Sequence, residues 1–258
     1  MAPRLLNGKV ARYRLATGWE TMNTRVIAEA AVSLHINGEP WLNFTCTPAE
    51  LKELAVGFLY NEKVIERSED IGSVDVRGGG SFIDVWLYRP VDRPTSWQRT
   101  SGCAGGMTTN PEVTLEPLKP DGRQTPPTAL LAAMDQLLEA QDLYREAGGV
   151  HSSALSDGTN IIARVEDIGR HNTLDKLAGR MLLEGLRPDP MIVLTTGRVS
   201  SEMLQKSARM GAGVVVSRTS ATSQSVALAE KLGVTLVGYA RRIGFLAYTH
   251  PHRLGLED

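Results

Sequence analysis

The chain of 258 residues is 42% apolar and 22% charged, a composition typical of a folded globular protein and not of a disordered one. Its 28 basic and 29 acidic residues give a net charge of -1, so no overall field favours nucleic acid or an anionic membrane, and any anion site must be local. The sequence shows neither a secretory leader nor an apolar run long enough to span a membrane, and we therefore expect a cytoplasmic protein without membrane contact.

The first part of the chain predicts a small α+β unit. Two β-rich runs, 26–36 and 41–45, flank the pair Asn37-Gly38, which is a strong signal for a hairpin turn. Two further short strands are predicted over 71–76 and 82–87, on either side of a run of three glycines.

A helix is predicted between these two strand pairs. Thr47 has the residue type of an N-cap, Pro48 suits the first helical position, and Glu50 would close a capping box. We assign residues 1–20 to an N-terminal tail and 21–120 to the α+β unit, which ends in a proline-rich segment without clear periodicity.

That proline-rich segment carries one of only two cysteines, too few for a disulfide framework. Cys46, on a predicted strand, is expected to be buried. Cys103 lies in "TSGCAGGMT", where the glycines let backbone N–H groups face a thiolate and lower the pKa of the thiol. Because a lone cysteine is more often a small buried apolar residue than a reagent, the residues alone leave both interpretations open.

Residues 121–258 predict an α/β domain, in which strands alternate with helices and parallel strands are covered on both faces. The helices are expected over 129–146, 172–183, 201–210 and 223–232, and the strands over 151–156, 161–166, 191–194, 214–216, 235–237 and, at an edge, 245–249.

Two strand-to-helix loops of this domain, 195–201 and 217–223, are rich in hydroxyl groups, and each contains an arginine. Ligands of open α/β sheets favour such loops, and a helix N-terminus offers free N–H groups to a phosphate. Simple helix capping explains one loop equally well, but the pair favours anion binding. Thr196, Gly197, Arg198, Thr219 and Ser220 are therefore our candidate phosphate contacts.

A third polar cluster, in 166–172, leaves a strand and enters a helix. His171 is a candidate acid–base or ligand-binding group, together with Arg170. The alternative, a buried network in which Glu166, Asp167 and Arg170 satisfy one another, stays open. The histidines do not have the spacing of a structural zinc motif, so no metal is expected.

Seven motifs occur together and resemble one known family, the formate dehydrogenase accessory sulfurtransferases of the FdhD family, over about 25–254. They are "TPAELKELAVGFLYNE", "SGCAGG", "GGVHSSAL", "EDIGRHNTLDKLAG", "TTGRVSSEMLQKSA", "SATSQSVALAEKLGVTLVGYARR" and "YTHPHRL".

The resemblance implies a sulfur carrier that takes persulfide sulfur from a cysteine desulfurase onto Cys103. It implies transfer of that sulfur to the molybdenum or tungsten bis-molybdopterin guanine dinucleotide cofactor of the formate dehydrogenase catalytic subunit, where the sulfur becomes a metal ligand. The family loop usually reads Cys-x-x-Cys, and here its second position is Gly106, so a mechanism that needs a disulfide within the loop is in doubt.

The resemblance also implies a cytidine-deaminase-like three-layer α/β fold for the C-terminal domain, used without zinc, and a homodimer. It implies GDP as a mimic of the cofactor, and a further cofactor-contacting stretch formed by Tyr239, Ala240, Arg241, Arg242, Ile243 and Gly244. Two alternatives remain open: a non-catalytic cofactor-binding chaperone for formate dehydrogenase, in which Cys103 is incidental, and a zinc-dependent deaminase, which the missing Cys-x-x-Cys disfavours.

Overall fold

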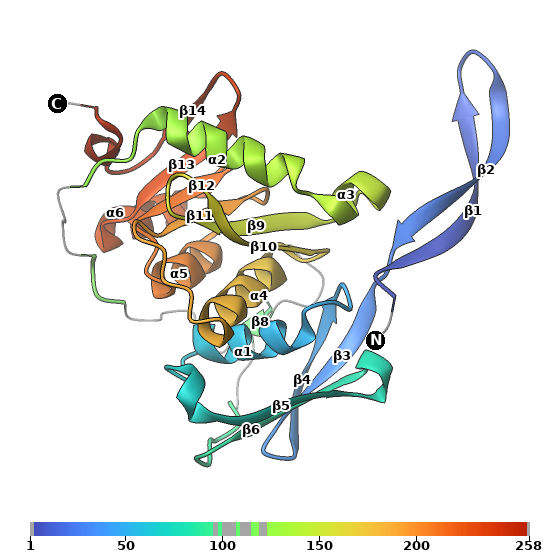
Figure 1. Cartoon of the computed structure of the whole chain (residues 1–258), viewed down its shortest axis with the longest axis horizontal. Coiled ribbons are helices and arrows are strands. Elements are labelled where there is room, and N and C mark those ends of the chain that lie inside the picture. The colour runs from blue at the N-terminus through green and yellow to red at the C-terminus, as the bar shows by residue number, and fades with distance from the viewer. Residues whose placement is uncertain (1–2, 95–97, 100–106, 109–114, 119–122, 257–258) are drawn as a thin grey trace.

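A computed structural model of the chain describes residues 3–94, 98–99, 107–108, 115–118 and 123–256. Figure 1 shows a six-stranded sheet with helices on both faces, a four-stranded sheet beside it, and a two-stranded ribbon that projects from the body. The predicted mixed α/β class is therefore confirmed. The likeness to a deaminase fold and the boundaries at residues 20 and 120 stay predictions.

The projecting ribbon consists of β1 (Leu5–Arg14) and β2 (Gly18–Ile27), antiparallel along their whole length. The sequence predicted one continuous strand over 26–36, which was wrong, because β2 ends at Ile27 and β3 begins at Ala30. Most side chains of the ribbon are exposed on both of its faces, so its sequence carries no alternation of apolar and polar residues from which strands are predicted.

The four-stranded sheet has the order β4-β3-β6-β5. The hairpin predicted at Asn37 and Gly38 is confirmed, because both residues have positive φ, 51° and 86°, as a type I′ turn requires. Its strands are β3 (Ala30–Ile36), β4 (Glu39–Cys46), β5 (Ile71–Arg77) and β6 (Phe82–Leu87).

The helix after β4, α1 (Leu51–Asn61), begins later than its sequence predicted. Glu50 is the N-cap, in the left-handed conformation and without a side-chain capping bond, so the predicted capping box was wrong. Thr47 instead bonds to the other half of the chain: its N–H donates to Asp167 Oδ2 at 3.0 Å, and its Oγ1 accepts from the N–H of Ile168 at 3.2 Å. A tertiary contact has replaced the local cap.

The six-stranded sheet has the order β10-β9-β11-β12-β13-β14, with β11, β12 and β13 parallel as predicted and β9 and β14 antiparallel to their neighbours. Its strands are β9 (His151–Ser156), β10 (Ile161–Asp167), β11 (Ile192–Thr195), β12 (Val214–Ser217), β13 (Thr235–Arg241) and, at the predicted edge, β14 (Gly244–Ala247).

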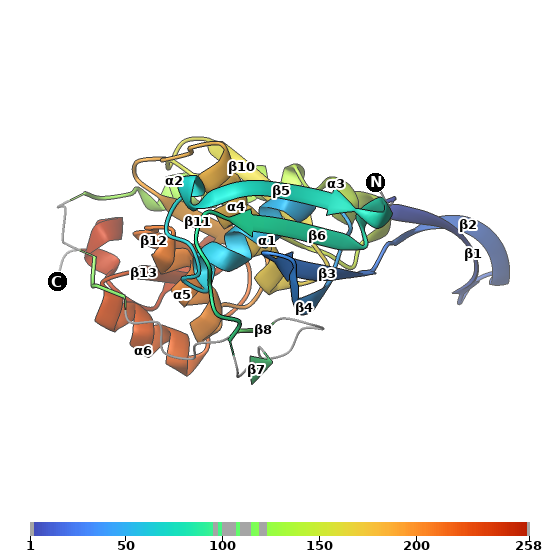
Figure 2. The ribbon, with the colours of Figure 1, turned by 90° about the horizontal axis from the view of Figure 1, so that it is seen from below.

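Helices cover both faces of this sheet (Figures 1 and 2). The single helix predicted over 129–146 is in fact α2 (Pro127–Glu139) and α3 (Asp142–Ala147). The break has a tertiary cause, because the Glu166 carboxylate accepts from three successive backbone N–H groups at the start of α3. The other face carries α4 (Arg170–Leu183), α5 (Ser201–Arg209) and α6 (Ser223–Leu232). Among the described helices, none has the length and apolar composition needed to cross a bilayer.

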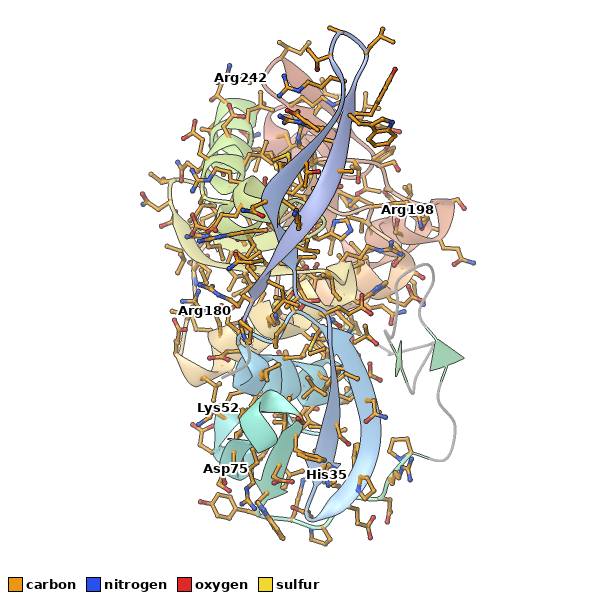
Figure 3. All side chains as sticks on the ribbon, turned by 90° about the vertical axis from the view of Figure 1, so that its right-hand side faces the viewer. His35, Lys52, Asp75, Arg180, Arg198 and Arg242 are labelled. Atoms are coloured by element: carbon orange, nitrogen blue, oxygen red, sulfur yellow. The ribbon has the colours of Figure 1, made fainter. Side chains whose placement is uncertain are left out.

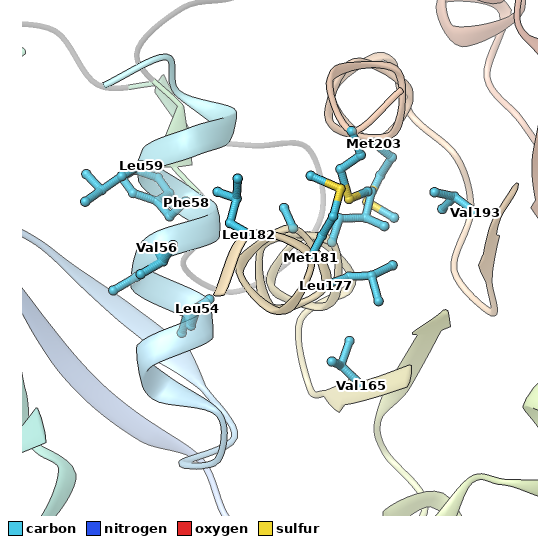
Figure 4. Close-up of a cluster of buried hydrophobic side chains, with 14 of the residues drawn as sticks. Leu54, Val56, Phe58, Leu59, Val165, Leu177, Met181, Leu182, Val193 and Met203 are labelled. Atoms are coloured by element: carbon cyan, nitrogen blue, oxygen red, sulfur yellow. The ribbon is translucent and has the colours of Figure 1, made fainter. Parts of the chain in front are cut away.

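The two halves of the molecule are joined where α1 crosses α4 (Figure 4). A Cβ placed on Gly57 of α1 would lie 1.7 Å from the carbonyl oxygen of Asp175, and one placed on Gly179 of α4 would lie 1.9 Å from the carbonyl oxygen of Glu53. Only glycine fits at both positions. The close approach places the apolar side chains of both helices in one continuous core.

Two buried ion pairs flank the crossing. Lys176 is fully buried and uses its three donors on Asp167 Oδ2 at 2.7 Å, the Thr47 carbonyl at 3.2 Å and the Glu166 carbonyl at 3.3 Å. Lys206 of α5 bonds both carboxylate oxygens of Asp175, at 2.6 and 2.7 Å. Because both charges are paired and hydrogen-bonded, removing one partner would cost about 3–5 kcal/mol.

The crossing yields a first prediction. Gly57→Ala forces the helices apart against backbone atoms, so its free energy of unfolding, measured by urea denaturation, should fall by about 3 kcal/mol or more. Gly213→Ala is the matched control, because a Cβ there meets no atom within 4 Å. Equal stability of the two variants would contradict a backbone-limited crossing.

Candidate functional site

The predicted polar loops lie together at one end of the strands of the six-stranded sheet. Four of its strands, β10, β11, β12 and β13, run in the same direction, so their carboxyl ends lie at the same end of the sheet. Helices α4, α5 and α6 begin there. Three helix N-termini therefore meet at one place, and each brings N–H groups that have no partner within the helix and a partial positive charge. This is the electrostatic basis of an anion site in a chain of net charge -1.

The two hydroxyl-rich loops lie side by side and are joined by hydrogen bonds. The N–H of Val199 donates to the Ser220 carbonyl at 3.0 Å, and Ser217 Oγ donates to the Gly197 carbonyl at 2.8 Å. Capping explains only one residue of each loop, since Ser200 accepts from the N–H of Met203 and Thr222 from that of Ser225. The predicted contacts Thr196, Gly197, Arg198, Thr219 and Ser220 are not caps. Arg198 is exposed, the three hydroxyl residues are partly exposed, and Gly197 is buried.

Gly197 lies against the start of α4. A Cβ there would come within 3.0 Å of the Arg170 side chain and 3.5 Å of Nδ1 of His151. The glycine therefore lets Arg170 and His151 approach the loop backbone. Burial, together with the positive charge of Arg170, lowers the pKa of His151, so its imidazole is neutral at pH 7.

His171 is buried one residue into α4 and reaches across to α5. Its Nε2 lies 3.5 Å from Ser200 Oγ and 3.5 Å from a carboxylate oxygen of Glu202. The hydrogen bond from His171 holds the pKa of Glu202 far below its usual value, at about 2. The Glu202 carboxylate is thus ionised throughout the physiological range and fixes the imidazole at the edge of the site.

The structure assigns separate partners to the acidic residues beside His171. Glu166 caps α3, while Asp167 accepts from Lys176, from the N–H groups of Thr47 and Gly169, and from the Asn172 amide. Both carboxylates are buried and hydrogen-bonded, but the partners shown for them are other residues, so the network predicted among Glu166, Asp167 and Arg170 is not the one observed. Arg170 packs against Gly197.

The stretch from Tyr239 to Gly244 divides between the two faces of the sheet. The N–H of Tyr239 donates to the Thr219 carbonyl at 2.7 Å, which joins its backbone to the polar loops. Ala240 is buried in the core beneath α2, and Arg242 points toward Asp135 of that helix at 3.9 Å. Figure 3 shows Arg242 and Arg198 well apart. Arg241 pairs with Gly244 at the hairpin end, where Ile243 is fully exposed.

Tyr239 holds a left-handed conformation with φ of 54°, which is unfavourable for a residue with a side chain. A Cβ on the preceding Gly238 would lie 2.7 Å from the Tyr248 ring and 3.0 Å from the Thr219 carbonyl. Backbone strain of this kind tends to occur where a side chain is held for function, and Tyr239 is held exposed beside the loops.

Cys103 lies outside the described residues. The described strands on either side of it, β7 (Gln98–Arg99) and β8 (Met107–Thr108), pair antiparallel, so both ends of the segment lie together. In Figure 3, these two strands and Arg198 lie on the same side of the molecule. Cys46 is buried as predicted, and burial raises the pKa of its thiol to about 12, so it is protonated and unreactive.

The arrangement can hold a large phosphate-bearing ligand. Helix N-termini, hydroxyl groups and arginine side chains all suit phosphate oxygens, and an exposed aromatic ring lies beside them. Within the described ranges, His, Cys, Asp and Glu side chains do not form a group of three that would hold a metal ion.

Sequence reasoning missed three parts of this site. His151 was assigned no role, Glu202 was not paired with His171, and Thr47 was assigned to a helix cap. The last two residues have partners 31 and 120 to 121 residues away, so no local pattern signals these contacts.

Fold and site together define a mixed α/β protein in which three helix N-termini meet at one end of the six-stranded sheet. Comparison with known proteins is more specific, because the model of the FdhD/NarQ family matches residues 27–255. The chain belongs to the FdhD/NarQ family.

Individual relatives agree over nearly the whole chain. "Sulfur carrier protein FdhD" of Bacillus subtilis (strain 168) is 32% identical over 260 residues, covering 96% of this chain and 99% of the relative. The protein of the same name from Staphylococcus aureus (strain bovine RF122 / ET3-1) is 31% identical over 265 residues, covering 96% of each chain. A crystal structure described as a formate dehydrogenase accessory protein from Desulfotalea psychrophila superposes with a TM-score of 0.78 at 27% identity, covering 98% of this chain and all of that one.

The His171–Glu202 contact yields a second prediction. A carboxylate whose pKa is lowered on folding stabilises the fold above its unfolded pKa near 4.5, and this stabilisation is lost as pH falls toward 2. Glu202→Gln should therefore lower the free energy of unfolding by about 2 kcal/mol at pH 7, after allowing for partial exposure. The difference from wild type should shrink in urea unfolding below pH 4.5.

Glu230→Gln is the control, since this exposed carboxylate lies 3.8 Å from His250 at the surface. A difference between Glu202→Gln and wild type that does not change with pH, or that grows on acidification, would contradict the assignment.

Proposed function

We propose that this protein is a sulfur carrier that receives persulfide sulfur on Cys103 from a cysteine desulfurase. It passes that sulfur to the molybdenum or tungsten bis-molybdopterin guanine dinucleotide cofactor of formate dehydrogenase. The observation that carries the proposal is full-length membership of a family whose relatives bear the name sulfur carrier protein. The accessory role described for the Desulfotalea protein supports formate dehydrogenase as the client.

Sulfur would reach the protein by thiol exchange. The Cys103 thiolate attacks the outer sulfur of the desulfurase persulfide, the S–S bond of that persulfide breaks, and the desulfurase cysteine leaves as a thiolate. Cys103 then carries the terminal sulfur. Of the two thiols in the chain, that of Cys46 is excluded from this step by its burial and its raised pKa.

The sulfur acceptor would dock at the end of the sheet where α4, α5 and α6 begin. Thr196, Gly197, Arg198, Thr219 and Ser220 are arranged to receive phosphate groups at helix N-termini. Arg170 and His171 line the same edge, and the exposed Tyr239 ring offers a stacking surface for guanine. Of the other predicted contacts, Ala240 and Arg242 lie toward α2, and Figure 3 shows Arg242 away from Arg198.

Release of sulfide from the Cys103 persulfide requires two electrons. In loops with two cysteines, the formation of a disulfide between the two thiols could supply them, but Gly106 stands at the second position. We therefore assign the reduction to an external thiol, which attacks the Cys103 sulfur of the persulfide, displaces sulfide and forms a mixed disulfide that a second thiol resolves.

The sulfur-carrying step is tested with a desulfurase and cysteine. Mass spectrometry should find a gain of one sulfur atom on the Cys103 peptide of the wild-type protein, and Cys103→Ala should lose all loading. Cys46→Ala is the control and should load as wild type does. Equal loading of the Cys103→Ala protein would overturn the carrier role and favour the cofactor-binding chaperone.

The docking edge is tested with GDP as a mimic. Saturating GDP should raise the Tm of the wild-type protein, because a ligand that binds only the folded state stabilises it by about 2.7 kcal/mol at one hundred times its Kd. Arg198→Ala should weaken GDP binding about ten-fold by losing a charge-assisted phosphate contact. Arg77→Ala, on the distant four-stranded sheet, should bind as wild type. An unchanged Tm at saturating GDP would contradict the assignment of this edge.

A further inference from the structure

A cavity of about 320 Å³ opens at the amino ends of the parallel strands, at the opposite end of the sheet from the candidate site. Its wall includes Met191, which precedes β11, and Gly213 and Val214, where β12 begins. The loops of the candidate site follow the other ends of these two strands. The cavity therefore shares no residue with the contacts predicted for the sulfur acceptor.

Backbone hydrogen bonds fix the chain segments that form the wall of this cavity. The N–H of Leu118 donates to the Leu232 carbonyl at 2.9 Å, and the N–H of Thr125 donates to the Arg253 carbonyl at 2.8 Å. A Cβ placed on Gly213 would meet no atom within 4 Å, so this part of the wall borders open space. The cavity is thus preformed, and its volume suits a small organic molecule.

The charged side chains that line the cavity are mostly basic. They are Arg123, Arg187 and Arg253, with Asp189 as the acidic residue among them. Arg123 forms an ion pair with Asp189. Two positive charges, those of Arg187 and Arg253, are left for a ligand, and this local excess occurs in a chain of net charge -1.

These two guanidinium groups are held in a similar way. Arg253 donates from Nη1 to the carbonyl groups of Gly213 and Gly233, and Arg187 donates from Nη1 to two carbonyl groups near the end of α4. Within the described part of the chain, Nε and Nη2 of both arginines make no hydrogen bond. Nε and Nη2 together form the fork that binds the two oxygens of a carboxylate.

We propose that this cavity binds a small organic dicarboxylate. Each carboxylate takes one arginine fork, and the two negative charges neutralise the two unpaired guanidinium groups. The hydrocarbon part of the ligand lies against the apolar side chains of the wall, which are Leu118, Pro188, Pro190, Met191 and Val214. Inorganic phosphate would leave this apolar wall without a contact. The inference is independent of sulfur transfer, because it uses no residue of the candidate site.

Isothermal titration calorimetry of the full chain tests the proposal with three probes: hexanedioate, hexanoate and inorganic phosphate. Hexanedioate should bind at least ten-fold more tightly than hexanoate, which has the hydrocarbon chain but only one carboxylate. It should exceed phosphate by a similar factor, because phosphate is charged but lacks the apolar part. A wild-type protein that does not bind hexanedioate, or that binds either other probe as tightly, would overturn the assignment.

Two variants locate the binding. Arg253→Lys keeps a charged donor for the backbone carbonyl groups but removes the fork, so the Kd for hexanedioate should rise about ten-fold. Gly213→Leu places a side chain in the open space and should abolish binding, while circular dichroism and Tm show that the protein stays folded. Arg67→Gln is the control, since this exposed arginine precedes β5 and does not line the cavity.

The control should bind hexanedioate as wild type does. Unchanged affinity in Gly213→Leu or in Arg253→Lys would place the ligand elsewhere and contradict the proposal, and so would an equal loss in Arg67→Gln. Persulfide loading of Cys103 is measured separately, so failure of the dicarboxylate site and failure of the carrier role are distinguishable.

Discussion

The glycine-to-glycine crossing of α1 and α4 is the constraint on which the rest of the molecule depends. At Gly57 and Gly179 each helix backbone lies in the space that a side chain would fill on the other helix. At this distance the side chains on either side of the crossing interlock, and the core of the four-stranded sheet continues into that of the six-stranded sheet. The relative position of the two halves is thus set by backbone contact, which cannot adjust as a side chain can.

The same helix carries the crossing and the site. α4 begins with Arg170 and His171 at the candidate site and meets α1 two turns later at Gly179. Between these points Lys176 binds Asp167, which in turn accepts from the N–H of Thr47 ahead of α1. A fully buried, fully hydrogen-bonded group of this kind tolerates little displacement, because any movement leaves a charge unpaired in a medium of low dielectric constant. The position of the site residues on α4 therefore follows from contacts made with the other half of the chain.

The sequence predicted most elements whose signals are local. The Asn37-Gly38 turn depends on the φ preferences of two adjacent residues, and α6 begins and ends where its pattern predicted. Predictions were wrong where the local structure depends on a residue that is distant in the sequence. The motif Thr47-Pro48-Ala49-Glu50 has the composition of a capping box, but Asp167 and Ile168 bind Thr47 more than a hundred residues away. Gln141 interrupts a helical pattern because Glu166 caps the next turn. The β1–β2 ribbon has no alternation because most of its side chains are exposed on both faces.

In the candidate site, too, some features could be predicted from local sequence and others depend on tertiary packing. The loops could be identified from composition, since hydroxyl groups, glycine and arginine after a buried strand indicate phosphate binding. The pairing of His171 with Glu202 could not, because the two residues approach only when α4 and α5 pack on the same sheet face. Three helix N-termini contribute partial positive charge at this end of the sheet, and exposed Arg198 adds a full charge. In a chain of net charge -1, such a local arrangement is the means by which the proposed site would attract a multiply charged anion.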